Sequence, residues 1–319
     1  GPLGFSFDIR DTFAVPDIAR NAEMMNEAWQ RSQYACDVDG IVSVDPVFIQ
    51  KMVEINGNIT LENGTVLTSE NTAEYMLNTI YKEVPVSLQD TYFEYIASTI
   101  MNKAFSNMDI AKMMKVAQSI GELTKNRHFY AYTFHDDEAK YFQGAGLAKG
   151  TPDSETDPEV GIYLNEQNPS KLGWYIDRKA QITKTGQNAD GSKTYHVTYT
   201  LTNTLTSSEM ATCTGYILGG EQAGVTGKPV AAPGTSAQRM LFYAPKGGSI
   251  SEITSSGDVR DQSNAVMDDQ KLVTNVAYIA PGESVTFDFD VTTSPKAESD
   301  LTIDQTPSGK MTNEVNYQY

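Results

Sequence analysis

The sequence predicts an α/β (α+β) N-terminal domain followed by an all-β immunoglobulin-like sandwich. Two patterns carry this prediction: a strand that runs directly into a helix at residues 39–56, and a series of alternating polar and apolar segments after Trp174. The chain has 319 residues, 39% of them hydrophobic, and is long enough for two cores. We expect the α/β domain at residues 5–172 and the sandwich at 173–319; residues 1–4 resemble the scar of a cleaved purification tag.

The strand and helix at residues 39–56 give the clearest local signal. Residues 41–44 are rich in β-branched side chains, which predicts a short buried strand. Asp45 and Pro46 then start a helix, because Asp accepts hydrogen bonds from free N–H groups and Pro is favoured at the first helical position. Apolar residues continue at helical spacing until an Asn-Gly pair ends the helix.

The rest of the first domain alternates helical and strand-like segments. Residues 5–9 have a strand pattern, and a further short strand is expected at 59–61. Periodicity and cap residues predict the remaining elements: helices over 17–33, 68–81, 88–105 and 108–123, a strand over 128–134, a helix from 135 and a last strand over 161–164.

After Trp174 the pattern changes to strands separated by turns rich in Gly, Asn and Pro. This spacing is typical of an antiparallel sandwich. The expected strands are 181–185, 194–203, 212–218, 239–243, 273–279 and 284–292.

Composition limits the classes of partner. The chain has 24 Lys and Arg against 41 Asp and Glu, a net charge of −17. This acidity argues against nucleic acid or anionic lipid as the main partner. Cys36 and Cys213 are the only cysteines, which excludes a disulfide framework and a zinc site of several cysteines. The sequence contains no apolar run long enough for a membrane span and no signal peptide.

Several motifs resemble the domain-of-unknown-function 4012 (DUF4012) family of bacterial cell-envelope proteins, found chiefly in Gram-positive actinobacteria. The resemblance implies an extracytoplasmic, cell-surface protein with an N-terminal membrane anchor and a further segment upstream of this sequence, and it implies no established activity. The residues that carry it are Pro16-Asp17, 39–46, 67–71, Arg127-His128, Asn165, 170–172, Tyr175, 199–200, 243–245 and 281–284.

A more distant resemblance is to the LytR-CpsA-Psr enzymes, which transfer lipid-linked glycopolymers to the cell wall. Val44-Asp45, Met52-Val53, Gly57 and Ile59 are similar to their pattern. Those enzymes hold a pyrophosphate with arginines on the following helix, but residues 90–96, in the comparable stretch, contain none. A pyrophosphate site needs cations, so this departure argues against the same chemistry.

The aspartates around the first strand are candidate binding residues. Asp45 follows the strand at its carboxyl end, where open α/β sheets place ligands. With Asp37 and Asp39 it could hold Mg²⁺ or Ca²⁺; otherwise we expect no cofactor. The alternative is that Asp45 caps the next helix while the other two stabilise turns, which the Asp-Pro pair favours.

Arg127 and His128 form a second candidate. Adjacent cationic side chains at the start of a strand could bind an anion. The alternative is a solvated strand edge.

We expect a binding or scaffolding module of the bacterial cell envelope, without catalysis. Its partner would be a cell-wall or surface glycopolymer or another envelope protein. The alternative is a glycopolymer transferase acting on a prenyl-pyrophosphate-linked substrate, which requires a basic pocket built from residues such as Arg10, Arg20 and Arg127. A weaker alternative is a metal-dependent hydrolase using the early aspartates.

Overall fold

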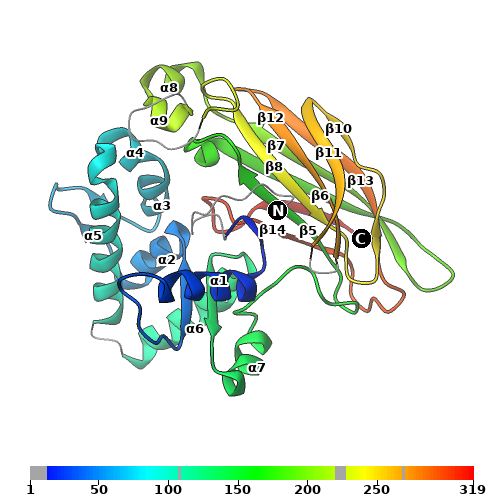
Figure 1. Cartoon of the computed structure of the whole chain (residues 1–319), viewed down its shortest axis with the longest axis horizontal. Helices are drawn as coiled ribbons and strands as arrows, with labels where there is room; N and C mark the ends of the chain where they lie inside the picture. Colours follow the sequence, from blue (N-terminus) through cyan, green and yellow to red (C-terminus); the bar gives the residue numbers. More distant parts are fainter. Residues whose placement is uncertain (1–12, 107–108, 220–227, 268–269) are drawn as a thin grey trace.

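The computed structural model describes residues 13–106, 109–219, 228–267 and 270–319. Among these, helices and two small sheets form the part built by residues up to about 150, and two larger sheets form most of the rest. Figure 1 shows the helices gathered on one side, with the long strands extending away from them. The combination of an α/β part and a β-rich part is confirmed, whereas the strand predicted at residues 5–9 lies outside the described residues.

The helical part follows the predicted order of elements. Its core is formed by fully buried side chains from four helical segments, including Met52, Ile80, Ile96 and Leu123. The elements are α1 (Ile18–Gln30), β1 (Gly40–Val44), α2 (Pro46–Asn56), β2 (Ile59–Thr60), β3 (Val66–Leu67), α3 (Thr72–Glu74), the π-helical turn η2 (Tyr75–Thr79), α4 (Ile80–Glu83), α5 (Val86–Phe105), α6 (Ile110–Lys125), β4 (Phe129–Thr133) and α7 (Asp136–Gly144).

Strand β1 differs from the buried strand that was predicted. It pairs in antiparallel register with β4 in a two-stranded sheet, and no other described strand extends that sheet. Val42 is 64% exposed and Val44 is 39% exposed, because one face of the pair is uncovered. The prediction of burial is therefore wrong, and the rule that places ligands at the carboxyl ends of open parallel sheets does not apply to Asp45.

The β-rich part consists of two sheets. One has the strand order β10-β13-β7-β6-β15, with β9 also pairing with β13, and the other has the order β11-β12-β8-β5-β14. The elements are β5 (Glu159–Glu166), the 3₁₀ turn η3 (Leu172–Tyr175), β6 (Ile176–Gln187), β7 (Lys193–Asn203), α8 (Ser207–Thr212), α9 (Gly215–Leu218), β8 (Ser236–Tyr243), β9 (Ser249–Ile250), β10 (Thr254–Ser256), β11 (Asp258–Met267), β12 (Gln270–Ile279), β13 (Ser284–Thr292), β14 (Thr302–Gln305) and β15 (Glu314–Gln318).

The two sheets share one core. Ile162 and Phe242 from one sheet and Tyr199 and Phe287 from the other are fully buried in the same cluster. The rings of Phe242 and Phe287 meet edge to face, with centroids 5.1 Å apart. The alternating patterns thus predicted a pair of packed sheets correctly, while the immunoglobulin-like form of the sandwich stays a prediction.

The strand predicted at residues 212–218 is wrong. This segment contains the end of α8 and the short helix α9. Thr206 and Glu209 form a capping box that starts α8, and the Thr214 side chain caps α9. These side-chain bonds to free N–H groups favour helical turns over the extended backbone that the apolar residues suggested.

The predicted domain boundary at residue 172 also needs correction. Strand β5, assigned from sequence to the first domain, lies between β8 and β14 in the five-stranded sheet. Val160, Ile162 and Leu164 are buried in the sandwich core, which fixes β5 there. The change from one part to the other therefore falls between α7 and β5.

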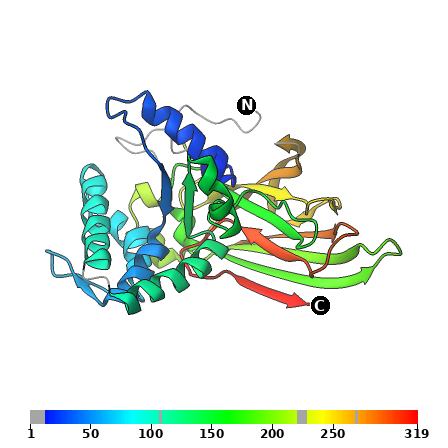
Figure 2. The same ribbon diagram turned by 90° about the horizontal axis from the view of Figure 1, so that it is seen from below.

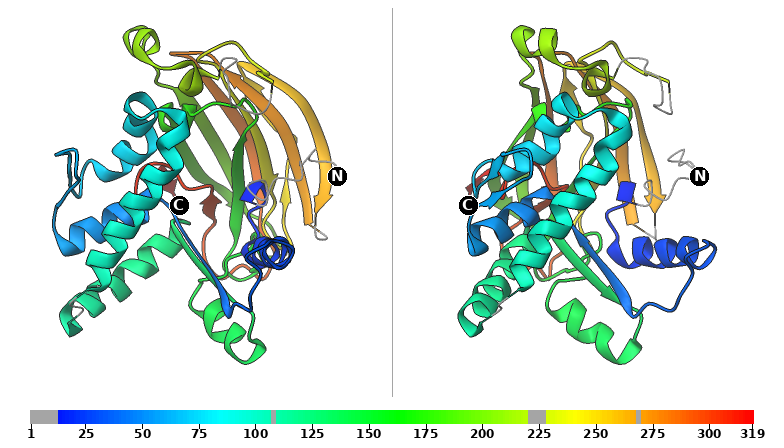
Figure 3. Two further views of the ribbon diagram at one scale, coloured as in Figure 1. Left: turned by 60° about the vertical axis from the view of Figure 1, so that its left-hand side comes forward. Right: turned by 90° about the vertical axis from the view of Figure 1, so that its left-hand side faces the viewer.

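The C-terminal segment connects both parts. β14 and β15 each add a parallel edge strand, to β5 and β6 respectively, and Figure 2 shows β15 ending on the side away from the helices. Between these strands the chain turns back, and Met311 packs against the helical core. Figure 3 shows this loop, in red, beside the blue and cyan helices.

No helix within the described ranges is both long and apolar enough to cross a membrane.

The shared core gives a stability prediction. Replacing the fully buried Phe242 with Ala removes the ring that contacts Phe287 and Phe289, and we expect unfolding to become easier by about 3–5 kcal/mol. Val266→Ala is the matched control, because Val266 is 65% exposed and should cost less than about 1 kcal/mol. Urea denaturation monitored by circular dichroism measures both. Equal losses would contradict the proposed core.

Candidate functional site

Arg127 lies in the turn between α6 and β4. Its backbone has a positive φ of 63°, and the next N–H, of His128, donates to the Leu123 carbonyl to close the helix. This left-handed conformation turns the chain sharply and directs the Arg127 side chain inward, where the residue is only 3% exposed. The interpretation of Arg127 as part of a solvated strand edge is therefore wrong.

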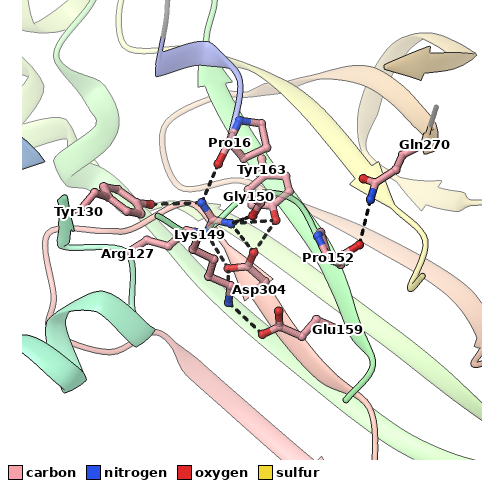
Figure 4. Close-up of polar contacts among 10 residues, drawn as sticks. All are labelled: Pro16, Arg127, Tyr130, Lys149, Gly150, Pro152, Glu159, Tyr163, Gln270 and Asp304. Atoms are coloured by element: carbon pink, nitrogen blue, oxygen red, sulfur yellow. Dashed lines mark hydrogen bonds and ion pairs between the residues drawn. The ribbon is translucent and has the colours of Figure 1, made fainter. Parts of the chain in front are cut away.

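The Arg127 guanidinium forms a buried ion pair with Asp304. Nε donates to Asp304 Oδ1 at 2.6 Å and Nη2 donates to Oδ2 at 2.5 Å. The same group donates to the carbonyls of Pro16 and Gly150, and Tyr163 donates its hydroxyl to Asp304 (Figure 4). The pair joins the α6–β4 turn to β14 and β5.

The charges of this cluster compensate one another. Burial alone would raise the pKa of Asp304, but the Arg127 guanidinium outweighs it and the pKa of Asp304 is lowered. Lys149 adds a second cation, with Nζ 3.3 Å from Asp304 Oδ1 and 2.9 Å from Glu159 Oε1. Burial raises the pKa of Glu159. The cluster therefore joins the two parts and leaves Arg127 unavailable for a pyrophosphate.

His128 and Asp45 meet beside this cluster. Nδ1 of His128 lies 2.6 Å from Asp45 Oδ2, and Nε2 lies 3.0 Å from the Met311 carbonyl. Because the carboxylate and the carbonyl are acceptors, we assign both ring nitrogens as donors. His128 is 2% exposed, so the strand-edge interpretation is wrong for it as well. The contact ties the C-terminal loop to the start of α2.

The three aspartates do not converge. Asp45 Oδ1 accepts from the N–H groups of Val47 and Phe48 at 2.9 and 3.0 Å, which confirms the capping alternative. Asp39, at the opposite end of β1, pairs with His135 at 2.9 Å on the surface, and Asp37 is exposed. Within the described part of the chain, no three His, Cys, Asp or Glu side chains are grouped so that they could hold a metal ion.

A polar cleft of about 280 Å³ lies elsewhere, between the start of β6 and the loop of residues 308–314. The loop is held in place from both parts of the molecule. Arg178 Nη1 donates to the carbonyls of Thr306 and Pro307 at 2.6 and 3.1 Å, and Lys310 Nζ lies 2.7 Å from Asp177 Oδ1. The bond from His128 to the Met311 carbonyl holds the same loop from the helical side.

Arg178 is the unusual residue of this cleft. Its Nε is buried and has no hydrogen-bond partner among the described residues. Burial lowers the pKa of Arg178, and no carboxylate offsets that effect. Whereas Arg127 is balanced by Asp304, the Arg178 guanidinium donates its hydrogen bonds within the described residues to carbonyl groups.

Sequence reasoning missed Arg178, although a signal was present. On β6, Ile176, Ala180 and Ile182 occupy alternate positions and face the sandwich core. Arg178 occupies the position between the first two, where a strand with one buried face normally carries an apolar residue. A charged residue at an inward position is a signal of a specialised site.

The buried ion pair gives a second prediction. Asp304→Asn leaves Arg127 buried without a counter-charge, and we expect a loss of about 3–5 kcal/mol in the free energy of unfolding. Asp258→Asn is the control, because it removes the same charge from an exposed pair with Arg260 and should change little. Urea titration at neutral pH measures both variants. A loss for Asp304→Asn no larger than for the control would rule out a stabilising role.

The same pair predicts a pH dependence. The folded-state pKa of Asp304 is lowered, whereas an unfolded Asp titrates near pH 4. Its contribution to stability is therefore complete above about pH 4 and is lost as the pH falls through the folded-state value. The gap in unfolding free energy between the native protein and Asp304→Asn should narrow over that acidic range. A gap that stays constant to pH 2 would contradict the assignment.

Comparison with known proteins gives a family match and a structural likeness. The family model described as "Protein of unknown function (DUF4012)" matches residues 1–81. No curated protein matches the chain. Among solved structures, a Legionella pneumophila protein, provisionally described as a nutrient binding protein, shares 12% identity, and the match covers 44% of each chain with a TM-score of 0.22.

The structural likeness carries no argument about this chain, and the LytR-CpsA-Psr resemblance stays a prediction from the sequence. The family match, by contrast, includes the strand and helix at residues 39–56 on which the DUF4012 resemblance partly rested. The match supports the resemblance to the DUF4012 family of proteins of unknown function over residues 1–81.

Proposed function

We propose that the protein is a non-catalytic binding module of the bacterial cell envelope and that the cleft beside Arg178 is its ligand site. The observation that carries the proposal is that the cleft is already formed and its loop wall is fixed. Contacts from Arg178, Lys310 and His128 hold that wall. A ligand that enters a fixed cleft does not have to order the loop, and this lowers the cost of binding.

The lining of the cleft favours a saccharide ligand. Trp174 lines it together with polar side chains such as Ser308, Thr312 and Asn313. An aromatic ring offers an apolar surface to the C–H face of a sugar, and hydroxyl and amide groups can exchange hydrogen bonds with sugar hydroxyls. A cell-wall or surface glycopolymer is therefore the partner we propose, and the paired sheets serve as an immunoglobulin-like support.

A larger groove of about 660 Å³ lies on the sandwich but is less suited to such a ligand. It is lined mainly by small and aliphatic side chains, and Lys271 is its one charged lining residue among those described. The smaller cleft combines an aromatic ring, a half-buried cation and polar side chains, which is the composition expected of a specific site.

Location at the cell envelope is part of the proposal. Support comes from the family resemblance and from the net charge of −17, which disfavours nucleic acid and anionic lipid surfaces as partners. The transferase alternative is less favoured, because Arg127 is already paired with Asp304 and so cannot bind a pyrophosphate. Arg10 lies outside the described residues.

Gly309 provides a test of the site. A Cβ at this position would come within 2.8–2.9 Å of the Trp174 ring, so Gly309→Ala should displace the ring and weaken binding to purified cell-wall polysaccharide. Gly121→Ala is the matched control, since nothing lies within 4 Å of its Cβ. Co-sedimentation measures binding, and tryptophan fluorescence reports the displaced ring. Failure of the native protein to bind any wall fraction would refute the proposed function, and equal binding by both variants would place the site elsewhere.

A further inference from the structure

We propose that the cleft binds a saccharide bearing a carboxylate and that Arg178 is the residue that pairs with that carboxylate. The inference rests on the proposed function and names the class of its ligand. It begins from the hydrogen-bond donors of Arg178. A guanidinium has five N–H donors, and here Nη1 donates to the Thr306 and Pro307 carbonyls while the buried Nε has no partner among the described residues.

A cation partly withdrawn from water without a counter-ion is costly, and an anion in the cleft would relieve that cost. The two carbonyls that Arg178 contacts carry only partial charge, so they satisfy donors without neutralising the guanidinium. Asp304 shows the difference within the same molecule, because it gives Arg127 a full counter-charge. Arg178 is therefore suited to a ligand that brings its own negative charge.

The charges around the cleft favour a single negative charge. Lys179 pairs with Glu314 at 3.1 Å, and Lys310 pairs with Asp177 at 2.7 Å, so these four groups cancel. Among the described residues of the lining, Arg178 then supplies the net positive charge. A carboxylate balances it and matches the planar guanidinium. A phosphate dianion would bring excess charge beside two rim carboxylates.

The size of the cleft limits how much of a ligand it holds. At about 280 Å³ it lies just below the roughly 300–1,000 Å³ of sites for drug-sized ligands. It suits one sugar unit of a polysaccharide, and the neighbouring sugar units of that polysaccharide would lie outside the cleft. The Trp174 ring, which a Cβ at Gly309 would meet at 2.8–2.9 Å, lines the cleft and is positioned to contact that sugar.

Calorimetric titration of the whole chain tests this with defined sugars. Trigalacturonate should bind about tenfold more tightly, or better, than the neutral galactose trimer, because only the first can pair with Arg178. Arg178→Gln should abolish the difference, and Arg178→Lys should restore part of it. Arg260→Gln removes an arginine from an exposed pair and should leave binding unchanged.

The outcomes separate this inference from the proposed function. Equal binding of the charged and neutral trimers would overturn the carboxylate assignment but would leave the proposed binding function intact. Tighter binding of glucose 6-phosphate than of trigalacturonate would have the same two consequences. If the protein binds a wall fraction and millimolar trigalacturonate does not inhibit that binding, the carboxylate assignment would also be overturned. The comparison of ligands on the native protein needs no variant, so the test stands even if Arg178→Gln misfolds.

Discussion

The buried pair between Arg127 and Asp304 is the interaction on which the joining of the two parts depends. Removing two charges from water is costly, and the attraction between them offsets that cost only when the remaining donors and acceptors are satisfied. Here the carbonyls of Pro16 and Gly150 and the hydroxyl of Tyr163 complete the set. The pair is favourable only when all of these segments are in place, so it selects one arrangement of the helical part against the sheets.

Two arginines near the C-terminal segment, the buried Arg127 and the half-buried Arg178, therefore have different consequences. Arg127 has a carboxylate from the protein itself, and its role is complete within the fold. Arg178 holds the same segment through two carbonyls, and its Nε has no partner in the described part of the chain. Arginine thus has two roles here: Arg127 joins the two parts, and Arg178 gives the proposed cleft its positive charge. The difference arises because β14 offers a carboxylate to Arg127, whereas the residues after β14 offer carbonyl oxygens to Arg178.

Local signals in the sequence predicted much of the fold. The Asp45 cap, the helices and most strands depend on neighbouring residues and could be read from spacing. The position of β5 could not be predicted in this way, because a short apolar strand is compatible with either part. Only its pairing with β8 and β14 shows that it belongs to the sandwich. The cleft was missed for the same reason, because it joins β6 to a loop more than a hundred residues later. Arg127 was a candidate from the sequence, but its pairing with Asp304, 177 residues away, could not be predicted.

The parallel edge strands also affect how the chain matures during synthesis. β14 covers the free side of β5, and β15 covers the free side of β6, so both sheets are completed by residues near the C-terminus. Such distant pairings are slow to form. A chain made from its N-terminus exposes Arg127 and the uncovered edges of both sheets until residues 302–318 leave the ribosome. The two parts therefore mature together only once that segment is available, in contrast to the stepwise folding usual for successive domains.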